Sequence, residues 1–304
     1  MSVPMIIDTD PGVDDAVALM LAAASPEVQL LALTTVFGNV GVEITTANAL
    51  RLRALAGLGH LPVAAGAAQP LVYPQHQRAE SPHGPDGLGG RARLLPEPIG
   101  PLHARGAVAL MADLLHAAPV PVTLVAIGPL TNIALLLAAH PEVKPRIDRI
   151  VIMGGHLGGP AAEFNIHSDP EAARRVLVEE DVPTTLVPLD LTLRAAVDSA
   201  WLATLAAAGP RCATLTGVVE HCRKTTGRDT VPLHDSLAVL EAAVPGTVRT
   251  TSMPLSVVCD HGPTRGAVVT SGATCTTRHV VQVALDADLP SVNATILARL
   301  RVVQ

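Results

Sequence analysis

The chain has 304 residues, of which 49% are hydrophobic and 16% charged, so it is long enough to bury a sizeable core. Its net charge of −6 and its few aromatic residues (one Trp, one Tyr and two Phe) argue against a nucleic-acid partner, because neither a basic face nor a set of stacking platforms is expected. The sequence also lacks an apolar run of about 20 residues that would span a bilayer, so no membrane partner is expected.

The cysteines and the N-terminus indicate the compartment. The four cysteines form no Cys-x-x-Cys pair, so reduced, buried thiols are expected rather than a zinc site or a disulfide framework. They are Cys212, Cys222, Cys259 and Cys275. The chain does not open with a basic region and a long apolar core, so we expect no signal peptide and a cytoplasmic protein.

Four acids within eight residues stand between two apolar runs near the start of the chain. Residues 3–7 read as a buried strand, and residues 16–22 as the start of a buried helix. Ligands bind at that edge of an open α/β sheet. Pro11 and Gly12 predict the tight turn between the two elements. The acids are Asp8, Asp10, Asp14 and Asp15, the last two in the first helical turn.

This acid cluster has two interpretations. One Asp before an apolar helix usually caps it, but four are more than a cap needs. Like charges this close repel one another, and burial raises the cost further. A hard cation removes the repulsion, and calcium, which takes roughly six to eight oxygen ligands, is usually bound by clustered carboxylates. The cluster therefore predicts a site for a metal and a substrate, without naming the reaction.

Strand-like and helix-like segments alternate along the rest of the chain, which is the pattern of a mostly parallel sheet covered by helices. We therefore predict an α/β fold in a single domain over 1–304, with a Rossmann-like central sheet and the active site at the carboxyl ends of its strands. Further strands are expected at 29–36, 62–64, 120–127, 149–155, 184–189, 255–260 and 280–285. Helices are expected at 42–58, 102–117, 198–207 and 291–300.

Polar residues outside the acid cluster have plain structural interpretations on their own. His83 lies in a long loop, 66–101, rich in Pro, Gly and His, and reads as part of a surface turn. Glu163 and Asn165 read as ordinary loop polarity before the helix start at Asp169-Pro170. His234 and Asp235 read as a helix cap and its neighbour.

A family resemblance changes these interpretations. The stretch Asp8-Thr9-Asp10-Pro11-Gly12-Val13-Asp14-Asp15-Ala16 resembles the N-terminal signature of the inosine-uridine-preferring nucleoside hydrolases. Residues 81–90, the run from Ala162 to Ala172 and the pair His234-Asp235 are similar to later segments of that family, in the same order. The resemblance covers nearly the whole chain. It implies hydrolysis of the N-glycosidic bond of ribonucleosides with a bound calcium ion.

The resemblance also implies a role for each matching residue. Calcium would be held by Asp10, Asp15, Asp235 and the backbone carbonyl of Ile127. Asp10 would act as general base, His234 would donate a proton or hydrogen bond to the leaving base, and His83 would be a weaker candidate for that task. The substrate would be bound by Asp14, Asn39, Met153, Glu163 and Asn165. A homodimer or homotetramer acting on small-molecule nucleosides in purine or pyrimidine salvage is implied by analogy.

Two departures from the family concern the substrate. The loop 156–162 is short and lacks the Asn that normally helps to hold the 5′-hydroxyl of the sugar, so a weak 5′-hydroxyl requirement is expected. The segment 221–228 is basic where relatives often have aromatic residues, so recognition of the base is expected to differ.

Two alternatives to a nucleoside hydrolase remain at this point. One is a phosphatase of the haloacid dehalogenase type, with Asp8 as nucleophile and Asp10 as acid. The lysine and the later acidic pair of that class are not evident in the sequence. The other is a ribose- or nucleoside-binding protein without turnover, against which the intact Asp10 argues.

Overall fold

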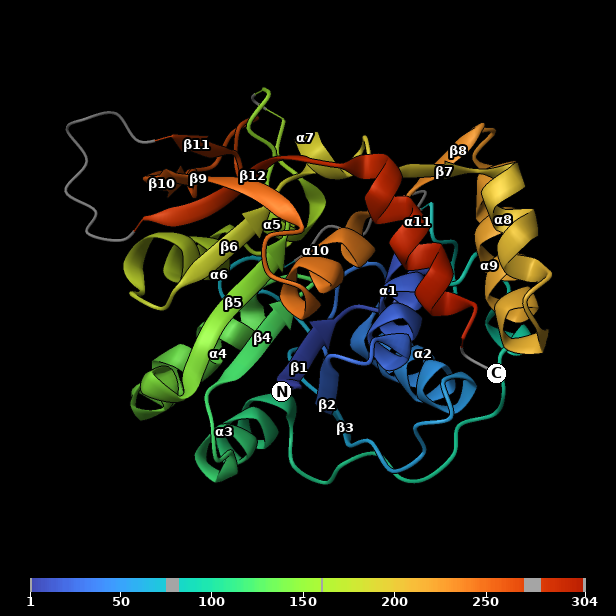
Figure 1. Cartoon of the computed structure of the whole chain (residues 1–304). Helices are drawn as coiled ribbons and strands as arrows, with labels where there is room; N and C mark the ends of the chain where they lie inside the picture. Colours follow the sequence, from blue (N-terminus) through green and yellow to red (C-terminus); the bar gives the residue numbers. More distant parts are fainter. Residues whose placement is uncertain (1, 75–81, 160, 271–279, 303–304) are drawn as a thin grey trace.

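The computed structural model describes residues 2–74, 82–159, 161–270 and 280–302, so Ser81 and Cys275 lie outside the described residues. Its centre is an eight-stranded sheet whose neighbouring strands are all parallel except the last pair (Figure 1). In sheet order the strands are β3 (Val63–Ala65), β2 (Val28–Thr35), β1 (Val3–Thr9), β4 (Val122–Ala126), β5 (Ile147–Met153), β6 (Thr184–Val187), β12 (Val281–Ala287) and β9 (Val248–Met253). The predicted α/β fold with a mostly parallel sheet is confirmed.

The strand order creates a switch point beside β1. This strand pairs with β2 on one side and with β4 on the other, and all three run parallel. Loops that follow β1 and β4 therefore lead to opposite sides and leave a crevice at the carboxyl edge of the sheet. Asp10 and Ile127, which directly follow these strands, lie at this edge.

Helices cover both faces of the sheet (Figure 1). The apolar cluster on one face includes residues of α1 (Val13–Ala24), α2 (Val42–Leu55), α8 (Ser199–Ala206), α9 (Pro210–Thr225), α10 (His234–Ala243) and α11 (Leu289–Leu300). The cluster on the other face includes residues of α3 (Ala107–Ala117), α4 (Thr131–Ala139) and α6 (Pro170–Arg174). Alternate residues of a strand enter alternate clusters, as the period of a strand requires: Met5 and Ile7 join the first and Ile6 the second.

Several short elements complete the chain. They are α5 (Phe164–Ser168), α7 (Leu189–Thr192), the 3₁₀ helices η1 (Ala92–Leu94) and η2 (Pro141–Arg146), the π-helical η3 (Arg175–Glu179), and two antiparallel pairs, β7 (Ala196–Asp198) with β8 (Thr230–Pro232) and β10 (Leu255–Val257) with β11 (Val268–Thr270). No helix within the described ranges has the length and apolarity that crossing a membrane requires.

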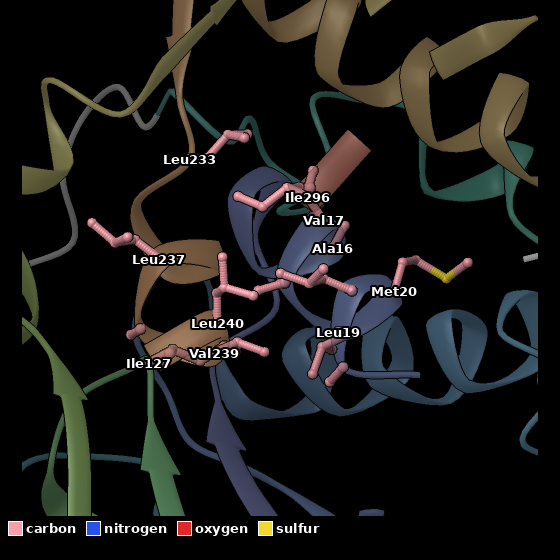
Figure 2. Packing of buried hydrophobic residues seen from close by; sticks show 14 of the residues in the cluster. Ala16, Val17, Leu19, Met20, Ile127, Leu233, Leu237, Val239, Leu240 and Ile296 are labelled. Carbon is pink, nitrogen blue, oxygen red and sulfur yellow. The ribbon is translucent and has the colours of Figure 1, made fainter. Parts of the chain in front are cut away.

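The packing of α1 against α10 matters most for the site. Figure 2 shows Ala16 and Val17 of α1 in one apolar cluster with Val239 and Leu240 of α10, and Ile296 of α11 beside them. Each fully buried Val or Leu of this kind contributes roughly 1.5–3 kcal/mol. This packing fixes the two helices so that both of their N-termini lie at the carboxyl edge of the sheet.

The structure corrects several predicted elements. The helix predicted over 102–117 begins only at Ala107, with Gly106 as its N-cap residue. The strand predicted over 255–260 ends at Val257. The prediction did not include β9, whose mostly exposed polar residues give little apolar signal, as is common for an edge strand. Residues 221–228 are not a separate segment: most of them form the last turns of α9 and its C-cap.

The cysteines follow the expected burial in part. Cys212 and Cys222 are buried, whereas Cys259 is only half-buried, because it lies in the loop that follows β10.

Candidate active site

A pocket of about 1000 Å³ opens at the carboxyl edge of the sheet. Its walls include Asn39 after β2, Ile127 after β4 and Met153 at the end of β5. Of the sequence-predicted site residues, all except Asp10 line this pocket directly, and Asp10 lies beneath it among the acids. Residues predicted from distant parts of the sequence thus meet in one place.

Three carboxylates converge from two helix N-termini. Each of Asp14, Asp15 and Asp235 places one oxygen within 4.8 Å of the others. Asp14 and Asp15 lie in the first turn of α1 and Asp235 in the first turn of α10, where the dipoles of both helices favour negative charge. Asp10 is not a member of this group of three, whereas Asp14, which the resemblance assigned to ribose, is.

Asp15 is held rigidly from its own side of the site. Its Oδ1 accepts a short hydrogen bond from the Thr9 hydroxyl, and its Oδ2 accepts one from the Gly12 amide at 2.8 Å. The second contact closes the first turn of α1, since Asp15 is the third residue of the helix. The carboxylate therefore has a fixed orientation toward the pocket.

Two glycines, Gly38 and Gly128, pack directly against the carboxyl group of Asp10. A β-carbon on Gly38 would collide with the Asp10 carboxyl, and one on Gly128 would lie 2.7 Å from its Oδ1. The Asn39 amide donates to Asp10 Oδ2 at 2.7 Å, and the Asn39 side chain donates to the Asp10 carbonyl at 3.1 Å. Oδ1 of Asp10 is buried and has no hydrogen-bond partner among the described residues.

Without a cation, keeping these buried carboxylates ionised side by side costs free energy, and their raised pKa values reflect this cost. Burial raises the pKa of Asp10 well above its ordinary value, and the charge of Asp15 raises it further. Burial and then the charge of Asp14 raise the pKa of Asp15 to about 7. Burial, followed by the charges of Asp14, Asp15 and Asp10, raises the pKa of Asp235 well above its ordinary value. The donors at this site are all oxygens, and their negative charges lie close together. One oxygen each of Asp10 and Asp14 is buried without a hydrogen-bond partner among the described residues. These features fit a hard divalent cation.

The carbonyl of Ile127 and the side chain of Asn165 meet on the opposite wall. Asn165 Nδ2 lies 3.3 Å from the Ile127 carbonyl oxygen and 3.2 Å from that of Met153. Asn165 therefore ties the ends of β4 and β5 together, and Ile127 is one of the residues that line the pocket.

Glu163 is fixed by backbone amides. It is the N-cap residue of α5, and its carboxylate accepts hydrogen bonds from the amides of Asn165 at 2.8 Å, Gly155 at 2.9 Å and Ile166 at 3.1 Å. The φ of +78° at Gly155 belongs to the left-handed region that favours glycine, so the turn that delivers this amide depends on that residue. Glu163 is consequently a preorganised acceptor on the pocket wall.

Residues 82–92, which include His83, form a turn closed by hydrogen bonds rather than a loose surface turn. Asp86 accepts hydrogen bonds from the amides of Leu88, Gly90 and Ala92, which closes the loop on itself. Asn48 Nδ2 then joins it to the first acid loop, donating to the carbonyls of Asp86 at 2.8 Å and Pro11 at 3.1 Å. Sequence reasoning missed both anchoring residues.

His83 itself contacts the start of α1. The Val13 amide donates to His83 Nδ1 at 3.1 Å, and Asp14 Oδ1 lies 3.8 Å from the same nitrogen. Since Nδ1 accepts a hydrogen bond in this arrangement, a neutral ring carries its proton on Nε2. His83 is thus positioned beside the acids and lines the pocket.

His234 is the first residue of α10 and lies next to Asp235. Its Nδ1 is 2.8 Å from the Thr192 hydroxyl, a partner that the sequence did not indicate. Burial lowers the pKa of His234; the charge of Asp14 opposes this, and the charges of His83 and Arg228 add to it. The lowered pKa favours the neutral ring near pH 7. His234 also lines the pocket.

Asp8, which belongs to the N-terminal motif, has a structural role. It is 1% exposed, and its Oδ1 accepts hydrogen bonds from Thr34 at 2.6 Å and Asn132 at 2.8 Å. Asp8 does not line the pocket, and its hydrogen bonds to Thr34 and Asn132 hold it in a structural position, which argues against the phosphatase alternative that made Asp8 the nucleophile.

The first two residues of the shortened loop after β5, His156 and Leu157, are held by Asp190. His156 Nε2 lies 3.6 Å from Asp190 Oδ1, and the Leu157 amide donates to Asp190 Oδ2 at 2.8 Å. His156 does not contribute to the wall of the pocket, which is formed here by Ala162 and Glu163.

Comparison with known proteins assigns this arrangement to a class. Residues 5–294 match the family model described as inosine-uridine preferring nucleoside hydrolase. The chain belongs to this family and is therefore a hydrolase that acts on the N-glycosyl bond of ribonucleosides.

Individual relatives agree with the family match. A pyrimidine-specific ribonucleoside hydrolase RihA from Photobacterium profundum is 51% identical over 201 residues, which cover 65% of this chain and 64% of that protein, a little under two thirds of it. The protein of the same name from Salmonella arizonae is 42% identical over 249 residues, 79% of each chain. The solved structure of a plant nucleoside hydrolase, the PpNRh1 enzyme, superposes with a TM-score of 0.91 at 28% identity and covers 99% of this chain and 100% of that one.

Proposed function

We propose that this enzyme hydrolyses pyrimidine ribonucleosides to ribose and free base with the help of a bound calcium ion. The observation that carries the proposal is the meeting of Asp14, Asp15 and Asp235, each with an oxygen within 4.8 Å of the others, at one end of a pocket of about 1000 Å³. The preference for pyrimidines is supported by the two relatives named as pyrimidine-specific.

The residues present suit calcium better than a softer metal. Asp15 and Asp235 would hold the ion from the two helix N-termini, and the Asp10 carboxylate and the Ile127 carbonyl would complete the oxygen ligands. All of these donors are hard oxygens, which suit calcium or magnesium rather than zinc. When bound, the cation would lower the pKa of a water molecule and bind the 2′- and 3′-hydroxyls of ribose.

The protein's own groups would then do the following. Asp10, whose Oδ1 has no other partner among the described residues, would accept a proton from the attacking water. Asp14, Asn39, Glu163 and Asn165 would orient the ribose. The backbone amides that hold the Glu163 carboxylate on the pocket wall support this role.

His234 would assist the departure of the base. When the Thr192 hydroxyl donates to Nδ1, the neutral ring carries its proton on Nε2, from which it would donate a hydrogen bond to the leaving nitrogen. His83, the second histidine on the pocket wall, would support the same step.

A panel of ribonucleosides tests the proposal. The metal-loaded enzyme is incubated with uridine, cytidine, inosine and adenosine, and free ribose is measured as reducing sugar. We expect release from the pyrimidine nucleosides, loss of that release in Asp235→Asn, and unchanged release in Asp148→Asn, which removes an exposed acid of β5. Retention of full activity in Asp235→Asn would contradict the assigned cation site.

A further inference from the structure

Arg228 lies where the main pocket opens into a second hollow. This hollow, of about 530 Å³, shares Pro82, Gly84, Pro85 and Arg228 with the main pocket. Arg228 is thus part of the wall of both. Arg228 and His234, the histidine proposed to assist the leaving base, line the same pocket.

The backbone of Arg228 is held by the end of α9. Gly227, with φ of +64°, follows the C-cap residue of the helix. The Gly227 amide donates to the Lys224 carbonyl at 3.2 Å, and the Arg228 amide donates to the Arg223 carbonyl at 3.1 Å. These two bonds form a Schellman motif, which ends a helix and sets the direction of the chain that leaves it. The position of Arg228 is therefore defined by the fold and not by a loose loop.

The neighbouring cations are occupied, whereas Arg228 is not. Arg223 pairs with Glu220, with contacts of 2.7 and 2.8 Å, and donates to the Arg228 carbonyl at 3.0 Å. Lys224 lies 3.4 Å from the same Glu220. Within the part of the chain that the structure describes, the guanidinium of Arg228 has no acid within ion-pair distance. An unpaired guanidinium on a pocket wall carries donors only, so it is complementary to an oxygen acceptor on the ligand.

We propose that Arg228 is a specificity-determining residue that binds an exocyclic oxygen of the leaving base, so that the enzyme prefers ribonucleosides of oxo-bases and cleaves uridine in preference to cytidine. This inference rests on the proposed function. Cytosine shares the 2-oxo group of uracil but carries an amino group at position 4, so Arg228 would distinguish the two bases by pairing with the 4-oxo oxygen of uracil.

The chemistry of bond cleavage strengthens this preference. The oxygen of water bonds to C1′, the C1′–N bond breaks, and its electron pair remains on the base nitrogen, while the proton of water passes to Asp10. In uracil this negative charge spreads onto the carbonyl oxygens, so a guanidinium beside one of them interacts more strongly in the transition state than with the intact nucleoside. Such a contact raises kcat as well as binding.

The test compares two substrates of equal size in matched variants. For Arg228→Met we expect kcat/KM for uridine to fall at least about tenfold, the effect of one hydrogen bond from a charged donor, and that for cytidine to fall less than about threefold. Arg228→Lys, which keeps the charge without the planar fork, should give an intermediate uridine loss. Lys224→Met removes a positive charge from the same helix end outside both hollows, and should leave both substrates unchanged.

A binding measurement keeps the test independent of turnover. Pseudouridine carries the same carbonyl oxygens on a C–C glycosidic bond that is not hydrolysed, so calorimetry should show weaker binding to Arg228→Met and unchanged binding to Lys224→Met. Equal losses for uridine and cytidine, or no loss, in a wild-type enzyme that cleaves uridine would overturn the role of Arg228 alone. A wild-type enzyme that releases ribose from no ribonucleoside would overturn the proposed function, and the role of Arg228 with it.

Discussion

Thr192 Oγ1 and His234 Nδ1 lie 2.8 Å apart, which joins the last residue of α7 to the first residue of α10. Helix α7 follows β6 of the central sheet and α10 follows β8 of the β7–β8 pair, so the contact is made only in the folded chain. Because Nδ1 is engaged with Thr192, Nε2 is the ring nitrogen left for a ligand in the pocket.

Replacing Thr192 by valine keeps the size of the side chain and removes the hydroxyl. We expect kcat for uridine to fall about 2- to 10-fold, the effect of one neutral hydrogen bond, because the ring no longer holds one orientation and tautomer. The same change in Thr204→Val, an exposed residue of α8, should have no effect. Equal kcat values for both variants in steady-state assays would argue against a positioning role for Thr192.

The roles of Asp10 and His234 can be separated by the leaving group. Asp10→Ala should lose about 10²- to 10⁴-fold in kcat for every substrate, the usual contribution of a general base, in addition to any loss of metal. His234→Ala should impair nucleosides most and spare p-nitrophenyl riboside, whose leaving group needs no proton. Equal losses on both substrates would show that His234 does not assist the leaving base.

Removal of the cation is the third test. Chelation should abolish activity, and calcium should restore it whereas zinc should not, because the ligands are all oxygens. Since an ion that binds only the folded state stabilises it, calcium at roughly a hundred times its Kd should add about 2.7 kcal/mol to the free energy of unfolding. Calorimetric melting of wild type and of Asp235→Asn checks this, and a calcium-dependent rise of equal size in the variant would count against Asp235 as a ligand.

The buried Asp8 predicts a pH-dependent stability difference. Burial raises its pKa from 3.8 to about 7, against the hydrogen bonds from Thr34 and Asn132. Between these two values the folded chain holds a proton that the unfolded chain has released, so the stability of wild type falls as the pH rises through that window. Asn cannot ionise, so Asp8→Asn should equal wild type near the lower value and exceed it above the upper value.

The size of this difference has a ceiling of about 4 kcal/mol, since each unit of pKa corresponds to about 1.4 kcal/mol. Denaturant unfolding with chelator at several pH values measures it. The exposed Asp148→Asn should track wild type at every pH. A gap between Asp8→Asn and wild type that does not change with pH would refute the assignment.

The short loop after β5 gives the last prediction. The loop lacks the Asn expected for the 5′-hydroxyl, and His156 is engaged with Asp190, so Glu163 is the strong acceptor that remains on that wall. We expect kcat/KM for 5′-deoxyuridine to be less than about tenfold below that for uridine, a difference of about 1.4 kcal/mol. A thousandfold loss would show that another residue binds the 5′-hydroxyl strongly.

The sequence predicted those parts of the site that contiguous motifs carry. Asp14 and Asp15 follow a strand and open a helix, so their place at the carboxyl edge followed from the alternation of elements, whereas a role for Asp235 was implied by the family resemblance. Even there, the prediction grouped Asp10 with the metal ligands and Asp14 with ribose, whereas the structure groups Asp14 with Asp15 and Asp235.

Residues that act through distant partners could not be predicted. Asn48 lies mid-helix in α2, and only the fold brings it to the carbonyls of Asp86 and Pro11. Arg228 stands among three cations of similar appearance in the sequence, and pairing with Glu220 distinguishes the other two. Strand β9 was missed because an edge strand pairs on one side only and needs little apolar sequence.

Because α10 packs on α1 and supplies Asp235, the site can form only late in synthesis on the ribosome. Residues 14 and 15 leave the ribosome early, but the helix that supplies Asp235 and covers the apolar side of α1 is complete only after Ala243. A nascent chain shorter than this keeps two repelling acids beside an uncovered helix and lacks Asp235. Cation affinity should therefore appear abruptly with chain length, which makes it a direct reporter of when the growing polypeptide first closes its core.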